Sequence, residues 1–354
     1  MAEFPDVLRA HGGVVTVVLA APSAIDDATE QLQRRWRNAR RVLRADGASD
    51  EDLEQLDGTV AELHHDDGTA VVLIRPKGGP TVVEFLLTPV DSDLAVVDEL
   101  PRLGPILESR QQLIPHMMVV ADRVGADIIG IYGDSTEAVE VEGDRLHIHR
   151  SQQGGWSQRR FQQRAENRWE SNSTAVAEEV ARMAHELEAR LVTVGGDVRA
   201  VTFLLEHLPA DVAGRVHKLV GQSPDAMAEE TVLEAAGVVA ADTVAVIERF
   251  RDSGSAGLAT DDLRSTLAAL TDGRVETLLV HDDVEDDRRA RFSAGSTWCA
   301  VDGDSAAWPP SGDEVAEARA VDVAIRSALL GDAKVRFVPS HGGPKDRLGA
   351  VLRW

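Results

Sequence analysis

A run of arginines surrounds two adjacent glycines near the middle of the chain. Residues 147–161 read HIHRSQQGGWSQRRF, so polar side chains flank Gly154 and Gly155 on both sides. Adjacent glycines reach backbone conformations that other residues avoid, which is typical of a loop tip. Such a basic loop suits contact with RNA, and an ordinary solvated loop before a helix is the alternative. The bases of residues 144–168 are Arg145, His147, His149, Arg150, Arg159, Arg160, Arg164 and Arg168, against the acids Asp144 and Glu166.

A second group of arginines lies on one face of a predicted helix. Residues 31–44 read QLQRRWRNARRVLR, and at 100° per residue five arginines fall within an arc of about 120°. They are Arg34, Arg37, Arg40, Arg41 and Arg44, while Leu32, Trp36, Ala39 and Leu43 share another face. Arginine binds phosphate through paired hydrogen bonds, so this face suits an RNA backbone. The alternative is a solvated face whose arginines pair with acids of the next helix, such as Asp50, Glu51 and Glu54.

The composition limits the classes of function. The chain has 354 residues, of which 43% are hydrophobic, and carries a formal net charge of −23. Such a charge disfavours indiscriminate nucleic-acid binding, so any RNA contact must come from local basic patches. Cys299 is the only cysteine, which excludes an internal disulfide and multi-cysteine zinc sites. We expect a cytoplasmic protein, because the first residues lack a signal-peptide core and no stretch approaches the roughly 20 apolar residues of a membrane helix.

Other candidate motifs have simpler explanations. Residues 64–67 read HHDD, and four adjacent residues rarely converge on one metal ion. His185-Glu186 lacks the second histidine of a zinc-protease helix. Gly195-Gly196-Asp197 has neither a P-loop lysine nor a full dinucleotide-binding pattern, so tight packing of a turn explains it better. No cofactor is expected.

The first segment, about residues 1–115, alternates strands and helices. Residues 13–20 (GVVTVVLA) predict a buried strand. Helices are predicted at 26–44 and 50–64, and strands at 70–75 and 81–87 around the turn Pro76-Lys77-Gly78-Gly79-Pro80. Pro101, Gly104 and Pro105 then indicate a linker.

The second segment, about residues 116–252, begins with three predicted strands and continues with helices. The strands are at 117–121, 126–132 and 138–142, and a polar stretch follows at 144–168. A helix at 175–189, a strand at 191–194, a helix at 198–207, a strand at 216–220 and a long helix at 227–251 complete the segment.

The third segment follows a polar linker at 252–257. It predicts a helix at 260–270, a strand at 275–280, a helix at 314–330 and a strand at 334–338, the rhythm of a compact α/β domain. Its acidic run is expected to be a solvated loop: Asp282, Asp283, Glu285, Asp286 and Asp287.

The order of strands, Gly-Gly loop and long helix resembles the middle domain of the class-1 release factors of archaea and eukaryotes. In that family the loop reads Gly-Gly-Gln-Ser, followed closely by Arg-Phe. The matching positions here are Gly154, Gly155, Ser157, Arg160 and Phe161, and residues 191–205 (LVTVGGDVRAVTFLL) also look like that domain. The resemblance is closest to the bacterial branch that includes the ribosome hibernation factor Balon and its actinobacterial relatives.

The resemblance implies a mixed α/β fold with three domains. These are an N-terminal α/β domain with the basic helix at 1–115, a release-factor-like middle domain at 116–252, and a compact α/β C-terminal domain at 258–354. It also implies that the C-terminal domain docks on a translational GTPase, which is elongation factor Tu in the Balon branch. No residue motif carries this last point.

One departure from the family pattern is decisive for the expected activity. Trp156 stands at the position of the family glutamine, which the resemblance implies helps to place the water that attacks peptidyl-tRNA. An indole does not reproduce the geometry of an amide, and Gln158 is displaced by two positions. Trp156 could instead stack on a nucleobase, worth roughly 1–3 kcal/mol per base, or pack against its own domain.

The sequence therefore predicts a non-enzymatic factor that occupies the A site of idle or stalled 70S ribosomes. The arginines of residues 34–44 would contact small-subunit RNA, and Arg150 and residues 154–160 (Gly154, Gly155, Trp156, Ser157, Gln158, Arg159, Arg160) would reach the large-subunit catalytic region. Two alternatives stay open. One is a peptidyl-tRNA hydrolase that uses Gln158, and the other is a protein-interaction module with no link to the ribosome.

Overall fold

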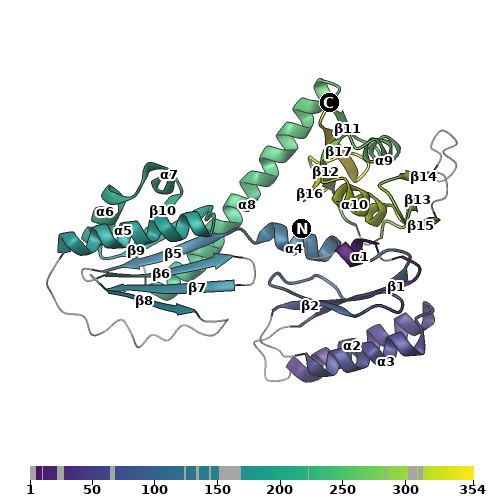
Figure 1. Ribbon diagram of the computed structural model, residues 1–354, viewed down its shortest axis with the longest axis horizontal. Helices are drawn as coiled ribbons and strands as arrows, with labels where there is room; N and C mark the ends of the chain where they lie inside the picture. The colour runs from purple at the N-terminus through teal and green to yellow at the C-terminus, as the bar shows by residue number, and fades with distance from the viewer. Residues whose placement is uncertain are drawn as a thin grey trace. The chain divides into compact units, whose positions relative to one another are not determined.

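The computed structural model shows a mixed α/β protein, as the sequence predicts (Figure 1). It describes residues 5–9, 11–21, 28–63, 68–122, 125–132, 135–142, 145–150, 169–221, 223–283, 285–301, 309 and 314–354. The chain forms two compact units, one of Met1–Gln111 with Thr243–Trp354 and one of Gln112–Asp242. The first and third predicted segments supply most of the first unit, and the second predicted segment supplies the other. The division into three domains stays a prediction.

The N-terminal part of the first unit is an antiparallel sheet with two helices on one face. Its strand order is β3-β2-β1-β4, formed by β1 (Val14–Ala20), β2 (Ala70–Arg75), β3 (Val82–Leu86) and β4 (Leu94–Asp98). Helices α2 (Ala28–Ala45) and α3 (Asp50–Glu62) cover the face that carries Val15, Val17 and Leu19. All of these elements except β4 agree with the sequence prediction, because alternation and helical periodicity are strong here.

The predicted linker around Pro101 and Pro105 is wrong, because a helix begins there. Helix α4 spans Gly104–Gln112. Proline in the first turn of a helix is compatible with helical geometry, since the first amides have no intrahelical acceptor. A Cβ atom at Gly104 would lie 2.5 Å from Oδ2 of Asp282, so close packing explains the glycine.

The C-terminal part of the first unit contains two further sheets. One has the order β11-β17-β12-β16, from β11 (Ala259–Thr260), β17 (Leu348–Leu352), β12 (Val275–Val280) and β16 (Lys334–Phe337). The other has the order β14-β13-β15, from β14 (Cys299–Val301), β13 (Arg289–Ser293) and β15 (Val315–Arg319). The helices are α9 (Leu263–Thr271) and α10 (Ala320–Leu330), and the short α1 (Pro5–Arg9) also joins this unit.

The predicted helix at 314–330 is wrong in its first third. Residues 315–319 form strand β15, which pairs antiparallel with β13, and only the remainder forms α10. Ladder hydrogen bonds to a strand more than 20 residues away override a local helical pattern. Residues 321–328 of α10 are all buried, so its surface carries no amphipathic signal.

The second unit is one mixed sheet between helical layers (Figure 1). Its strand order is β10-β9-β5-β6-β7-β8, from β5 (His116–Ala121), β6 (Gly125–Tyr132), β7 (Ser135–Glu142), β8 (Arg145–Arg150), β9 (Leu191–Gly196) and β10 (Val216–Val220). Strands β5, β9 and β10 are parallel, and β5 to β8 form an antiparallel meander. Helices α5 (Trp169–Glu186), α6 (Val198–His207) and α7 (Ala210–Ala213) supply the core on one face.

The first part of α8 (Pro224–Ser255) packs on the other face of this sheet, where Met227 joins Met118 and Ile129. The helix continues past the predicted end at residue 251 into the predicted linker.

Strand β8 also differs from the prediction, which placed a polar stretch there. In the strand register, Leu146 and Ile148 stand opposite Val141 and Val139 of β7, so the backbone ladder to β7 accounts for the strand.

Candidate functional site

Helix α2 has the two faces that its sequence predicts. Leu32, Trp36, Ala39 and Leu43 are all buried, at most 5% exposed. They pack with Leu53 and Leu56 of α3 and with the first sheet. The indole nitrogen of Trp36 donates to Oδ1 of Asp57 at 2.8 Å. The apolar face therefore fixes the rotation of α2, and that rotation turns the arginines away from the core.

Two of the five predicted arginines are paired with acids, as the alternative interpretation proposed. Nε of Arg40 donates to both carboxylate oxygens of Asp57, each at 3.0 Å. Arg44 pairs with Asp50 at 3.0 Å. Arg35, which the sequence analysis did not select, pairs with Asp93 at 2.9 Å. These guanidinium groups are partly neutralised within the chain.

The other three arginines, Arg34, Arg37 and Arg41, are exposed. Within the described part of the chain, none of them makes a hydrogen bond or an ion pair. Their spacing of three and four residues places them on adjacent turns of one helix face. We call Arg34, Arg37 and Arg41 the open arginine face. Three unneutralised guanidinium groups in a row can each donate to a phosphate oxygen.

The arginine-rich Gly-Gly stretch lies mostly outside the described residues. This holds for Gly154, Gly155, Trp156, Ser157, Gln158, Arg159 and Arg160. Arg150, the last residue of β8, stands opposite Glu137 of β7 in the strand register. The stretch thus connects the edge strand β8 to helix α5 in the second unit. Its contact with RNA stays a prediction.

The Gly195-Gly196-Asp197 turn in the second unit is explained by packing, as predicted. Gly196 has φ +111°, and a Cβ atom there would lie 2.0 Å from the carbonyl oxygen of Ala121. A Cβ atom at Gly195 would lie 2.5 Å from Sδ of Met227. Oδ1 of Asp197 accepts hydrogen bonds from the amides of Arg199 and Ala200, at 3.0 and 3.2 Å. The helix N-terminus is therefore capped by its own aspartate.

A known protein family matches the part of the chain that forms the second unit. Residues 115–255 match the family described as bacterial archaeo-eukaryotic release factor family 2. This segment is a release-factor-like domain. The match confirms the resemblance to the release-factor superfamily that the Gly-Gly loop and the LVTVGGDVRAVTFLL stretch indicate. It covers α5 to α8 and the whole six-stranded sheet.

Sequence similarity to two other proteins covers more of the chain than the release-factor-like domain. Uncharacterized protein Rv2629 of Mycobacterium tuberculosis strain ATCC 25618 / H37Rv is 27% identical over 340 residues, or 93% of this chain and 90% of that protein. Uncharacterized protein MT2704 of strain CDC 1551 / Oshkosh matches with the same values, 27% over 340 residues.

Two archaeal proteins are among the solved structures that match this chain. The translation termination factor aRF1 is 15% identical, with 100% of this chain and 97% of that chain covered and a TM-score of 0.24. Pelota in a ribosome-bound complex with ABCE1 is 15% identical, with 97% and 90% covered and a TM-score of 0.41.

The release-factor-like domain shows no metal site in its described residues. His185 contacts Oδ2 of Asp211 at 2.8 Å, and this hydrogen bond is the main reason that the pKa of Asp211 lies below its usual value. Across all described residues, no group of three or more His, Cys, Asp and Glu side chains is placed to hold a metal ion. No described helix is long and apolar enough to cross a membrane.

The acidic run at 282–287 in the first unit is only partly the solvated loop that the sequence predicts, because Glu285 and Asp287 are exposed while the other three acids are paired. Asp286 is 5% exposed and accepts from Arg288 at 2.7 Å, which lowers its pKa. Asp282 accepts from the buried Arg319 at 2.5 Å. Asp283 pairs with Arg347 at 3.0 Å. The prediction failed for these three acids because two of these arginines come from distant parts of the chain.

Cys299 is expected to resist alkylation in the folded protein. It is 1% exposed, and burial raises the pKa of its thiol to about 11. Thiolate is the reactive form, so iodoacetamide at pH 8 should modify the native chain at least a hundredfold more slowly than the urea-unfolded chain. Mass spectrometry of timed samples measures both rates. Equal rates would contradict the buried position.

Proposed function

We propose that this chain is a ribosome-binding translation factor that occupies the A site of idle or stalled ribosomes. The observation that carries the proposal is the match of residues 115–255 to a bacterial family of archaeo-eukaryotic release factors. A domain of this family supports a role in which the chain binds the ribosome. A cytoplasmic location goes with the proposal.

The open arginine face supports an RNA contact. Arg34, Arg37 and Arg41 are exposed and lack intramolecular acids within the described residues, although the chain carries a net charge of −23. Cations that stay unpaired in such an acidic protein form a local attraction for phosphate. In this proposal α2 contacts small-subunit RNA, and the stretch 150–160 approaches the large-subunit catalytic region.

Protection of the ribosome fits the sequence better than peptide release. Trp156 stands where the family has its glutamine, and its indole has no amide with which to orient a water molecule. The chain then holds the A site without cleaving peptidyl-tRNA. Delivery by a GTPase such as elongation factor Tu, through residues 258–354, belongs to the same proposal.

Sedimentation with 70S ribosomes tests the proposal. We expect the purified chain to co-sediment at low salt, to dissociate as salt rises, and to compete with aminoacyl-tRNA for the A site. No co-sedimentation at low salt would overturn the proposal, as would binding that A-site tRNA does not displace.

A release assay on the same complexes separates protection from hydrolysis. Ribosomes that carry peptidyl-tRNA should keep their peptide when the chain binds. Release that Gln158→Ala abolishes would instead establish the hydrolase alternative.

A further inference from the structure

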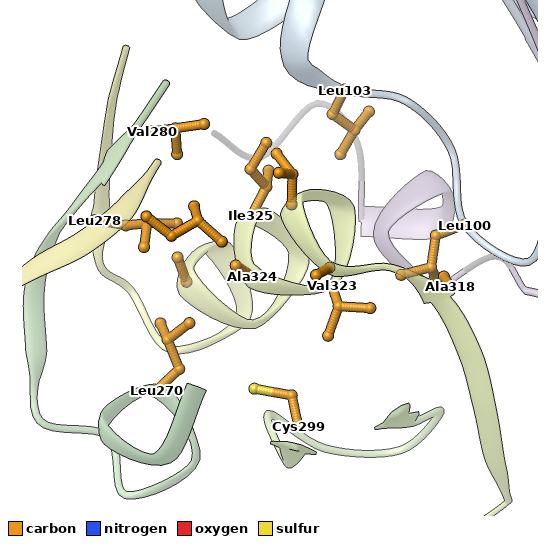
Figure 2. Close-up of a cluster of buried hydrophobic side chains, with 14 of the residues drawn as sticks. Leu100, Leu103, Leu270, Leu278, Val280, Cys299, Ala318, Val323, Ala324 and Ile325 are labelled. Carbon is orange, nitrogen blue, oxygen red and sulfur yellow. The ribbon is translucent and has the colours of Figure 1, made fainter. Parts of the chain in front are cut away.

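Within the first unit, the N-terminal sheet packs directly on the C-terminal part. Leu100 and Leu103, which follow β4, belong to the same buried cluster as Ala318, Val323 and Ile325. Figure 2 shows Leu100 beside Ala318, with Leu103 above the helix that carries Ile325. We call this contact between residues 98–103 and residues 318–326 the seam.

Several polar contacts cross the seam or lie next to it. Asp98, at the end of β4, pairs with Arg289 of β13 at 3.0 Å. Nε of Arg326 donates to the carbonyl oxygen of Leu8 at 2.9 Å. The side chain of Gln111 exchanges two hydrogen bonds with the backbone of Phe337, at 2.9 and 2.8 Å. Each of these groups has its hydrogen-bond partner, as buried polar groups need.

Asp322 and Nε of Arg102 are exceptions at the centre of the seam, because neither group has a hydrogen-bond partner among the described residues. The side chain of Asp322 is 1% exposed, and Oδ2 lies 3.2 Å from Nε of Arg102. Oδ1 lies 3.7 Å from Nη1 of Arg319. Neither oxygen accepts a hydrogen bond from the described residues. An ionised carboxylate in this position is attracted by two nearby guanidinium groups but has lost its hydration. Coulomb attraction without hydrogen bonds offsets the free-energy cost of that dehydration only in part.

We propose that Asp322 is a proton-operated latch of the seam, which the neutral carboxyl keeps closed and the ionised carboxylate loosens. Four charged residues from other elements act on the Asp322 carboxyl. Arg102 follows β4 and Arg319 ends β15, and both favour the charge. Asp98 of β4 and Asp282 after β12 oppose it.

The direction of the pH effect follows from these groups. Burial is the largest influence and raises the pKa of Asp322 from 3.8 to about 7, against the lowering by Arg102 and Arg319. A carboxyl with a higher pKa in the closed form binds its proton more tightly there than in the open form. Stability of the seam is therefore complete below pH 4 and is lost as pH rises toward 7. Opening should become roughly fiftyfold more frequent between pH 5 and 7, and change little above pH 8.

Hydrogen exchange of the full-length chain from pH 5 to 9 tests the latch. Opening is read from peptides covering 94–103 and 319–326, after correction for the intrinsic pH dependence of exchange, with β5 as the reference. In the native sequence, seam protection should fall between pH 5 and 7 while β5 stays constant. Seam protection that does not change with pH would overturn the proposal, and this result needs no variant.

Three variants sharpen the test. Asp322→Asn keeps the shape of the neutral carboxyl, so its seam should stay closed at every pH. Arg102→Met removes a cation that favours ionisation, so the transition should move to higher pH if the side chain titrates as proposed. Glu276→Gln removes an exposed partner of Arg249 in the same unit and should behave as the native chain. An unchanged pH profile in Asp322→Asn would refute the latch.

Discussion

Gly196→Ala is expected to destabilise the second unit by about 3–5 kcal/mol, enough to unfold much of it at 37 °C. Gly196 ends β9 at φ +111°, a region that L-residues rarely adopt. A Cβ atom would also lie 2.0 Å from the carbonyl oxygen of Ala121. That oxygen already accepts the amide of Asp197 at 2.9 Å, so moving it breaks a second contact. Strain and collision therefore add at one position.

Urea unfolding followed by circular dichroism measures this loss, and Gly221 supplies a matched control. Gly221 lies in the same unit with φ +86°, and no atom lies within 4 Å of a Cβ atom placed there. Gly221→Ala should therefore show only the backbone strain, about 1 kcal/mol. Equal losses in the two variants would show that the close approach to Ala121 contributes nothing.

Reversal of the open arginine face is expected to lower ribosome affinity by roughly 10- to 100-fold at moderate salt. The variant replaces Arg34, Arg37 and Arg41 with glutamate. The three side chains are exposed and make no described contacts, so the fold should be unchanged. Each lost phosphate contact removes about 0.7–0.9 from the slope of log affinity against log salt, so the slope should fall by about 2–3. Co-sedimentation across a salt series gives both quantities.

Two further variants separate this face from the rest of α2. Lysine at the same three positions keeps the charge and should retain most of the salt slope, with a smaller loss of affinity because lysine lacks the paired donors. Arg44→Ala, which removes a cation already paired with Asp50, should have a small effect. A glutamate variant that binds as the native chain would exclude α2 from the interface.

Helix α2 shows how far periodicity reaches and where it stops. The spacing of Leu32, Trp36 and Leu43 predicts which side is buried, because a 3.6-residue repeat sets the faces of any helix. The same spacing predicts that Arg37 and Arg40 are equally exposed and equally available to a ligand. Only the packing of α3 places Asp57 beside Arg40 and leaves Arg37 open.

Strands β8 and β15 show where local sequence patterns failed to predict secondary structure. Residues 145–150 read as a polar stretch and 315–319 as helix, yet both form edge strands of their sheets. An edge strand takes its hydrogen bonds from one neighbour, and that neighbour decides the conformation over weak local preference. For β15 the neighbour is β13, whose alignment depends on the whole C-terminal part.

By itself, the sequence determined the buried face of α2, strands β1 to β3, β12 and β16 of the first unit, most strands of the second unit, and the relation of the middle segment to release factors. These follow from local periodicity and from a contiguous motif, which the chain carries wherever it folds. Only the tertiary structure decided that the acids at 282–287 meet Arg319 and Arg347, that Arg34, Arg37 and Arg41 have no acidic partner among the described residues, and that Asp322 lies buried at the seam. Ion pairs and burial depend on residues far apart in the chain, and their distances exist only after the core has closed.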